Sequence, residues 1–168
     1  MELLEGSIRL ESSEGKGCVF YFTHPYRKVR RQEKERKPLS APPGQKFKQD
    51  LCILVAEDDN VNRILLEKVL GGKHIDVVAT VDGCQAVREV RQNPRINLVL
   101  MDIRMPGMDG YEALREIKGA RPELPVIAHT AFALPEDKKN ALDAGFDAFL
   151  TKPVNIDELF GLIRRFTE

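Results

Sequence analysis

The sequence predicts an α/β protein built on a doubly wound, five-stranded parallel sheet with helices on both faces. Between about residue 50 and residue 168, short apolar runs alternate with stretches of helical periodicity, which is typical of successive βα units. Several runs are apolar almost throughout, including LVLM at 98–101 and VIAHT at 126–130, as expected of strands that are covered on both faces.

The first element along the chain is a predicted β-hairpin within residues 1–25. Residues 7–11 alternate polar and apolar side chains, residues 18–22 do so less regularly, and Gly15 and Gly17 lie between them. Chains below about 40 residues rarely fold unaided, and a lone hairpin is marginal in water. We therefore expect a hairpin fragment of a larger domain. Its open strand edge can pair with a second copy, so the oligomeric state stays open.

Residues 26–49 are expected to form a linker. Residues 27–38 contain seven Lys and Arg against two Glu, and two prolines and a glycine follow without any apolar period. The whole chain has 26 basic and 26 acidic residues, so its formal net charge is zero. A basic run without interleaved aromatic residues is usually a solvated segment, and no nucleic-acid partner is expected.

The cysteines and the apolar runs indicate a cytoplasmic chain. Cys18, Cys52 and Cys84 are widely spaced and form no CxxC pair, which argues against a disulfide framework or a zinc site. No apolar run approaches the roughly 18 residues of a transmembrane helix. The first residues lack the basic and apolar segments of a signal peptide, so no membrane segment is expected.

The segment 50–168 is expected to contain five strands and five helices in alternation. The last helix has the clearest pattern, since five apolar residues between Ile156 and Phe166 recur at helical spacing. The strands are expected at 52–56, 77–80, 98–101, 126–130 and 148–150. The helices are expected near 60–70, 84–92, 110–119, 135–144 and 155–166.

Polar residues close four of the five predicted strands. Ligands bind beyond the carboxyl ends of the strands in an open α/β sheet, so these residues are expected to meet at one edge. They are Glu57, Asp58 and Asp59 after the first strand, Asp102 after the third, Thr130 and Ala131 at the fourth, and Thr151, Lys152 and Pro153 at the fifth.

This set of side chains suits phosphoryl chemistry. Clustered carboxylates repel one another unless a cation lies among them, and an oxygen site with open positions suits Mg²⁺. An Asp carboxylate can attack a phosphoryl group, a lysine can neutralise a phosphate oxygen, and a threonine hydroxyl can donate to another. Each residue alone has an ordinary explanation, because an Asp at a strand end often caps a helix. Their conjunction on four strands favours a site.

Residues 50–168 resemble the receiver domains of two-component signalling proteins, which have a flavodoxin-like sheet with strand order 2-1-3-4-5. The resemblance covers the whole segment in order. It rests on ILVAEDDNVNR at 53–63, VLMDIRMPGMDGYE at 99–112, VIAHTA at 126–131 and FLTKPV at 149–154.

The resemblance implies a role for each matching residue. Asp102 matches the phosphoacceptor, with Asp58 as a magnesium ligand, Glu57 as a ligand through water and the backbone carbonyl of Arg104 as a further ligand. Thr130 matches the switch hydroxyl, Lys152 the phosphate-binding lysine and Phe149 the aromatic switch, with Ala131 and Pro153 in support and a cis bond before Pro153. Asp59 is expected to be peripheral.

Two further expectations concern dynamics. The fourth helix, fifth strand and fifth helix are expected to form the face that phosphorylation switches. Arg104 and Phe132 are bulky and flank the expected path of a hydrolytic water, which predicts slow self-dephosphorylation.

The first 25 residues are similar to the end of the ATP-binding domain of sensor histidine kinases. The chain therefore resembles the C-terminal part of a hybrid histidine kinase, whose full length can be membrane-anchored. The 168 residues include neither the kinase ATP site nor its phosphoacceptor histidine, so no ATP binding or histidine autophosphorylation is expected. The three histidines, His24, His74 and His129, are interpreted as ordinary loop or strand residues. The matching positions are Gly6, Ile8, Leu10, Ser12, Gly15, Gly17 and residues 20–22.

The predicted function is a phosphorelay step in which Asp102 takes a phosphoryl group from a phosphohistidine and passes it to a histidine-phosphotransfer partner. Two alternatives stay open. One is an interaction module that works without phosphorylation. The other is a small-molecule phosphatase with an Asp nucleophile, which usually needs an acid–base Asp where this chain has Arg104.

Overall fold

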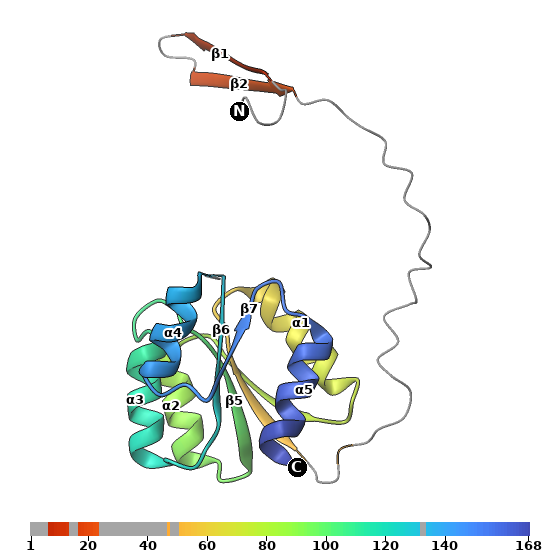
Figure 1. Ribbon diagram of the computed structural model, residues 1–168, viewed down its shortest axis with the longest axis vertical. Coiled ribbons are helices and arrows are strands. Elements are labelled where there is room, and N and C mark those ends of the chain that lie inside the picture. The colour runs from red at the N-terminus through yellow and green to blue at the C-terminus, as the bar shows by residue number, and fades with distance from the viewer. Residues whose placement is uncertain (1–6, 14–16, 24–46, 48–50, 132–133) are drawn as a thin grey trace. The chain divides into compact units, whose positions relative to one another are not determined.

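The computed structural model describes residues 7–13, 17–23, 47, 51–131 and 134–168 (Figure 1). The chain divides into two units, Met1–Ser40 and Ala41–Glu168. Within the first unit, β1 (Ser7–Ser13) and β2 (Gly17–Thr23) form an antiparallel pair, as predicted.

One face of this hairpin is apolar and exposed. Leu10 pairs directly with Phe20, so their side chains share a face, and Ile8 lies two residues from Leu10 on the same side. Ile8, Leu10 and Phe20 are 56%, 51% and 65% exposed, so nothing in the described part of the chain covers them. On the opposite face Arg9 pairs with Glu11 at 2.7 Å.

The second unit contains a five-stranded sheet in the order β4-β3-β5-β6-β7, with every neighbouring pair parallel. This is the predicted 2-1-3-4-5 order. One strand is longer than predicted, since it spans Ile96–Asp102 and not only 98–101. The polar residue Asn97 fits into this strand because its amide oxygen accepts a hydrogen bond from Cys52 N at 2.9 Å. The strands are β3 (Cys52–Ala56), β4 (Asp76–Thr80), β5 (Ile96–Asp102), β6 (Val126–Thr130) and β7 (Ala148–Thr151).

Five helices follow the strands, close to their predicted bounds. Side chains of Asp59, Asp82, Asp109 and Asn155 cap four of them by accepting backbone N–H hydrogen bonds. No helix within the described residues is long and apolar enough to span a membrane. The helices are α1 (Asn60–Gly71), α2 (Gly83–Gln92), α3 (Gly110–Ala120), α4 (Pro135–Asp143) and α5 (Ile156–Thr167).

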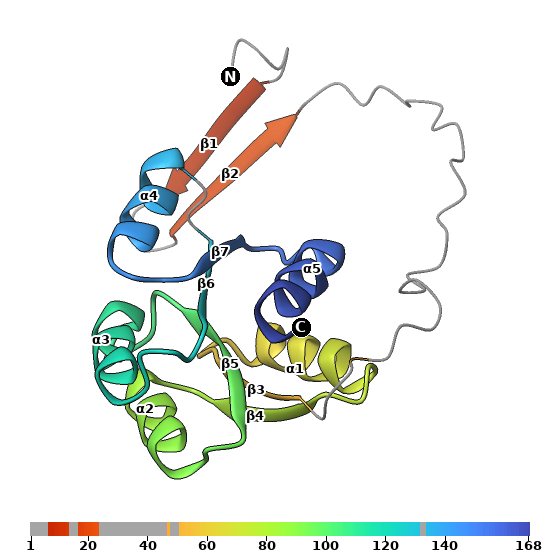
Figure 2. The same ribbon diagram turned by 60° about the horizontal axis from the view of Figure 1, so that its bottom comes forward.

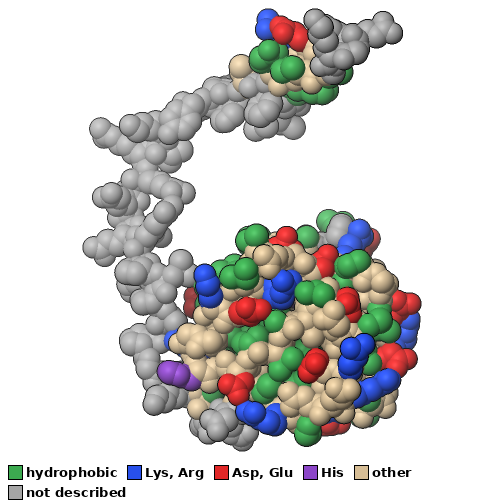
Figure 3. Space-filling model, turned by 180° about the vertical axis from the view of Figure 1, so that it is seen from behind, with side chains coloured by type: hydrophobic (Ala, Val, Ile, Leu, Met, Phe, Trp, Pro, Cys, Tyr) green, Lys and Arg blue, Asp and Glu red, His purple; other side chains and the backbone are tan. Residues whose placement is uncertain are grey.

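The helices cover both faces of the sheet. Helices α1 and α5 lie on one side, and α2, α3 and α4 lie on the other (Figures 1 and 2). Alternate strand residues enter two separate cores: Ile53, Leu100 and Ile127 pack on the α1/α5 side, whereas Leu54 and Met101 pack on the other. Basic and acidic side chains are interspersed over the outer face seen in Figure 3.

Candidate active site

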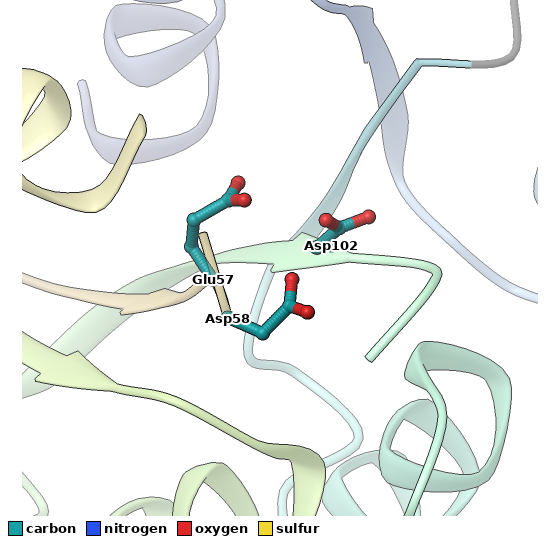
Figure 4. A group of neighbouring side chains, drawn as sticks. All are labelled: Glu57, Asp58 and Asp102. Carbon is teal, nitrogen blue, oxygen red and sulfur yellow. The ribbon is translucent and has the colours of Figure 1, made fainter. Parts of the chain in front are cut away.

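Three carboxylates converge at the carboxyl edge of the sheet (Figure 4). Glu57 and Asp58 follow β3 directly, and Asp102 ends the neighbouring strand β5. One oxygen from each lies within 4.8 Å of the others. Glu57 and Asp102 are buried and Asp58 is exposed, so solvent reaches the cluster from one side.

Lys152 supplies the positive charge among these carboxylates. Its Nζ lies 2.7 Å from both Oε1 and Oε2 of Glu57 and 2.5 Å from Oδ2 of Asp102. Its backbone N–H donates to the carbonyl of Thr130 at 2.9 Å, and the bond to Pro153 is cis, as expected. The lysine therefore compensates part of the repulsion that burying two carboxylates creates.

Burial and pairing act in opposite directions on the pKa values of this site. Burial raises the pKa of Asp102 above its ordinary value, and the hydrogen bonds from Lys152 and Arg104 N offset it only in part. For Glu57, burial also acts upward, but His129 and Lys152 together bring its pKa below the ordinary value. Burial pushes the pKa of Lys152 down, and its two carboxylate partners more than reverse this.

The carboxylate of Asp102 is held by contacts within the site and does not cap a helix. Its Oδ1 accepts a hydrogen bond from Arg104 N at 3.0 Å, while Oδ2 faces Lys152. The cap of the following helix α3 is Asp109, which forms a capping box with Glu112. The ordinary explanation for a strand-end aspartate therefore does not apply here.

The remaining predicted residues lie in the strands of the sheet or in the loops that follow them. Thr130 is buried at the end of β6, Ala131 is exposed, and Phe149 is buried on the α2/α3/α4 side of the sheet. Asp59 caps α1 by accepting from Asn62 N at 2.8 Å, which agrees with its expected peripheral role. Phe132 lies outside the described residues.

One buried residue of this site was missed in the sequence. His129 is only 4% exposed, and its Nδ1 lies 3.4 Å from Oε2 of Glu57. The signal was the strand period, since His129 shares a face with Ile127 and so continues a buried row to the end of β6. A polar side chain at that position must face the polar residues that end or follow the neighbouring strands.

The donors of the cluster fit a hard divalent cation. They are carboxylate oxygens, with no sulfur and no imidazole within the group of three. Such a donor set suits Mg²⁺, which keeps several waters and needs few protein ligands, and is unlike the nitrogen and sulfur sites of zinc.

Comparisons with known proteins agree with this geometry. The receiver domain of sensor histidine kinase PA1611 from Pseudomonas aeruginosa is 38% identical with a TM-score of 0.65, covering 71% of this chain and 98% of that one. That structure has a magnesium ion coordinated in its active-site cleft. A putative response regulator from Chloroflexus aurantiacus has a TM-score of 0.66 at 25% identity and covers 71% of this chain and 98% of that one.

The curated relatives are sensor proteins. The autoinducer 2 sensor kinase/phosphatase LuxQ of Vibrio vulnificus is 33% identical over 167 residues, which are 99% of this chain and 19% of LuxQ. Sensor protein EvgS of Escherichia coli is 31% identical over 160 residues, which are 93% of this chain and 13% of EvgS. This chain thus spans less than a fifth of either relative. Residues 53–164 match the response regulator receiver domain family, and the chain belongs to it.

Proposed function

We propose that this chain is a phosphorelay receiver in which Asp102 accepts a phosphoryl group from a phosphohistidine and passes it on. The observation that carries the proposal is the placement of Asp102. Its carboxylate ends a central strand, faces Lys152 at 2.5 Å and lies beside the carboxylates of Glu57 and Asp58. A buried nucleophile next to a fixed cation is what transfer of a dianionic group requires.

In the proposed step, an oxygen of Asp102 attacks the phosphorus of the phosphohistidine. The new O–P bond forms as the P–N bond breaks, the electron pair stays on the imidazole nitrogen, and that nitrogen takes up a proton. Lys152 neutralises one phosphoryl oxygen, and the Thr130 hydroxyl donates to another. The reverse step, from Asp102 to the histidine of a phosphotransfer partner, uses the same groups.

Magnesium is the proposed cofactor. Asp58, Asp102 and the backbone carbonyl of Arg104 would hold it, with Glu57 acting through water, and the bound ion would neutralise charge that develops on the phosphoryl oxygens. The all-oxygen cluster supports this choice.

Phosphorylation is proposed to switch the face formed by α4, β7 and α5. Thr130 lies one strand away from β7, and its backbone is paired with Thr151, so a pull on Thr130 reaches that face directly. Phe149 is already buried in the core, which supports repacking of the face without a large swing of this ring.

We infer that the chain comes from a hybrid sensor kinase, with residues 1–25 ending an ATP-binding domain and residues 26–49 linking it to a receiver at 50–168. The LuxQ match supports this, because it covers 99% of the chain and so extends beyond the receiver family match at 53–164. The exposed apolar face of the hairpin also supports it, because a larger domain would bury Ile8, Leu10 and Phe20. Such a chain would act in the cytoplasm, with a phosphohistidine domain as its partner.

The test is intact mass after incubation with acetyl phosphate and Mg²⁺. We expect one added phosphoryl group on the wild-type chain, none on Asp102→Asn and none without Mg²⁺. Asp109→Asn is the matched control, because Asp109 lies seven residues from Asp102 but only caps α3, so the adduct should remain. A folded wild-type chain that takes no phosphoryl group would instead favour the interaction-module function.

A further inference from the structure

Four strands end in, or are followed by, a polar residue that continues the buried row on the α1/α5 side of the sheet. Asp102 and His129 end the buried rows of β5 and β6, and their Cα atoms are register partners. Glu57 and Lys152 continue the corresponding rows of β3 and β7. Three of these four residues belong to the proposed phosphoryl site, and His129 ends the buried row of β6 without an assigned role.

His129 faces the buried oxygen of Glu57. Its Nδ1 is 3.4 Å from Oε2, and both side chains are almost fully buried, at 5% and 1% exposed. Lys152 also approaches this oxygen, with Nζ 2.7 Å away, but its hydrogen bond goes to Oε1, and Oε2 has no hydrogen-bond partner among the described residues. Asn62 approaches only Oε1, at 3.5 Å.

The lysine cannot hold Glu57 alone throughout the reaction. In the proposed function, Lys152 turns its ammonium group toward a phosphoryl oxygen, and its three donors must then serve Asp102, Glu57 and the new anion together. A second donor at Oε2 would keep the Glu57 carboxylate oriented when the lysine is shared.

The ring of His129 has the chemistry for this task. Its Nε2 is buried and has no hydrogen-bond partner among the described residues. Because an unpaired buried N–H is unfavourable, the tautomer with its hydrogen on Nδ1 and a bare Nε2 is preferred, and Nδ1 lies 3.4 Å from the unpartnered Oε2 of Glu57.

We propose that His129 is a positioning residue that fixes the Glu57 carboxylate from Nδ1 and thereby sets the affinity of the acidic cluster for Mg²⁺. This inference rests on the proposed function, in which Glu57 holds the ion through water. Partners behind a metal-holding group commonly change metal affinity when they are removed.

Two substitutions separate hydrogen bonding from packing. His129→Leu fills the space with an apolar side chain but removes the donor, whereas His129→Asn keeps an N–H donor close to the position of Nδ1. Calorimetric titration of the full chain with Mg²⁺ should show about tenfold weaker binding for His129→Leu. His129→Asn should bind within about twofold of the wild type.

A packing role predicts the opposite order, because a leucine suits this buried position better than an asparagine does. Wild-type affinity in His129→Leu, or an equal loss in both variants, would overturn the proposal.

A metal-free readout keeps this inference distinct from the proposed function. Long-range ¹H–¹⁵N spectra of the histidine rings, assigned with His129→Leu, should show His129 protonated on Nδ1 and bare on Nε2. A ring protonated only on Nε2 would overturn the inference even if the chain binds Mg²⁺. Conversely, a wild-type chain that shows the Nδ1 tautomer but binds no Mg²⁺ contradicts the proposed function and the role in metal affinity together.

Discussion

Lys152 Nζ lies 2.7 Å from each carboxylate oxygen of Glu57, although the two residues are 95 positions apart in the sequence. Glu57 follows β3 and Lys152 follows β7, and strands β5 and β6 lie between these two in the sheet. The lysine side chain therefore reaches across two strands. The same ammonium group meets Asp102. Removing it would leave two buried carboxylates facing each other and Asp58 without a compensating charge.

Lys152→Met should therefore lower the free energy of unfolding by roughly 3 kcal/mol in metal-free buffer. Mg²⁺ should return much of this loss, because a cation again lies among the carboxylates and no lysine competes with it. Urea denaturation with and without Mg²⁺ measures both effects. A variant as stable as the wild type without metal would contradict the electrostatic account.

Lys118→Met is the matched control for that experiment. Lys118 pairs with Asp147 at 2.7 Å and donates to the carbonyl of Leu124, and its side chain is 23% exposed. Its loss should lower the free energy of unfolding by about 1–2 kcal/mol, since Asp147 keeps its hydrogen bond from Val126 N. The response of this variant to Mg²⁺ should equal that of the wild type, because the pair has no part in the acidic cluster.

Gly110 lets helix α3 approach the backbone of Asp102 closely. A Cβ at this position would lie 2.4 Å from the carbonyl oxygen of Asp102 and 2.7 Å from Cα of Ile103. Gly110→Ala should lower the free energy of unfolding by about 1–3 kcal/mol and slow phosphorylation, because the loop that carries Asp102 must shift. Thermal unfolding and intact-mass time courses measure the two effects.

Gly119 on the same helix provides the contrast. A Cβ there meets nothing within 4 Å, so Gly119→Ala should raise the free energy of unfolding by up to about 1 kcal/mol through helix propensity alone. Its phosphorylation rate should stay at the wild-type value. Equal effects of the two alanines on stability would show that close packing at Asp102 is unimportant.

The edge that gathers the polar residues could be predicted because it follows from the alternation of strands and helices along the chain, whereas the strand order followed from the resemblance to receiver domains. Parallel strands joined by helices place their carboxyl ends together, so Asp102 and Lys152 had to share an edge with the residues after β3. The extra length of β5 could not be predicted, since the hydrogen bond of Asn97 to Cys52 joins residues 45 positions apart.

The role of His129 was missed for a related reason. From the local sequence, a single histidine in a strand is interpreted as an ordinary core residue. Only the short distance from His129 to Glu57 shows that it belongs to the site. That distance depends on β5 lying between β3 and β6, which no local pattern specifies. The peripheral place of Asp59 was expected from the resemblance, and its cap of α1 agrees with that expectation. The role of Asp58 as a metal ligand stays a prediction.

Helix α1 begins beside the site and exposes apolar side chains, and the proposed function predicts that a phosphohistidine domain contacts them. Val61, Ile64 and Leu65 are 74%, 39% and 47% exposed, one to two turns from the acidic residues after β3. Leu65→Glu should slow phosphoryl transfer from a phosphohistidine domain at least about tenfold while leaving phosphorylation by acetyl phosphate unchanged. Leu142→Glu on α4, where the side chain is 41% exposed, is the comparison. A larger effect of Leu142→Glu would place docking on the switching face instead.

Arg104 should protect the aspartyl phosphate from water. It is exposed two residues after Asp102, and its backbone N–H donates to that carboxylate at 3.0 Å. We expect the phosphorylated chain to last many minutes, and Arg104→Ala to shorten this lifetime because an attacking water gains a free path. Arg104→Lys keeps length and charge and should retain most of the protection. Intact-mass decay after removal of acetyl phosphate measures all three lifetimes, and loss within seconds in the wild type, unchanged in Arg104→Ala, would contradict this role.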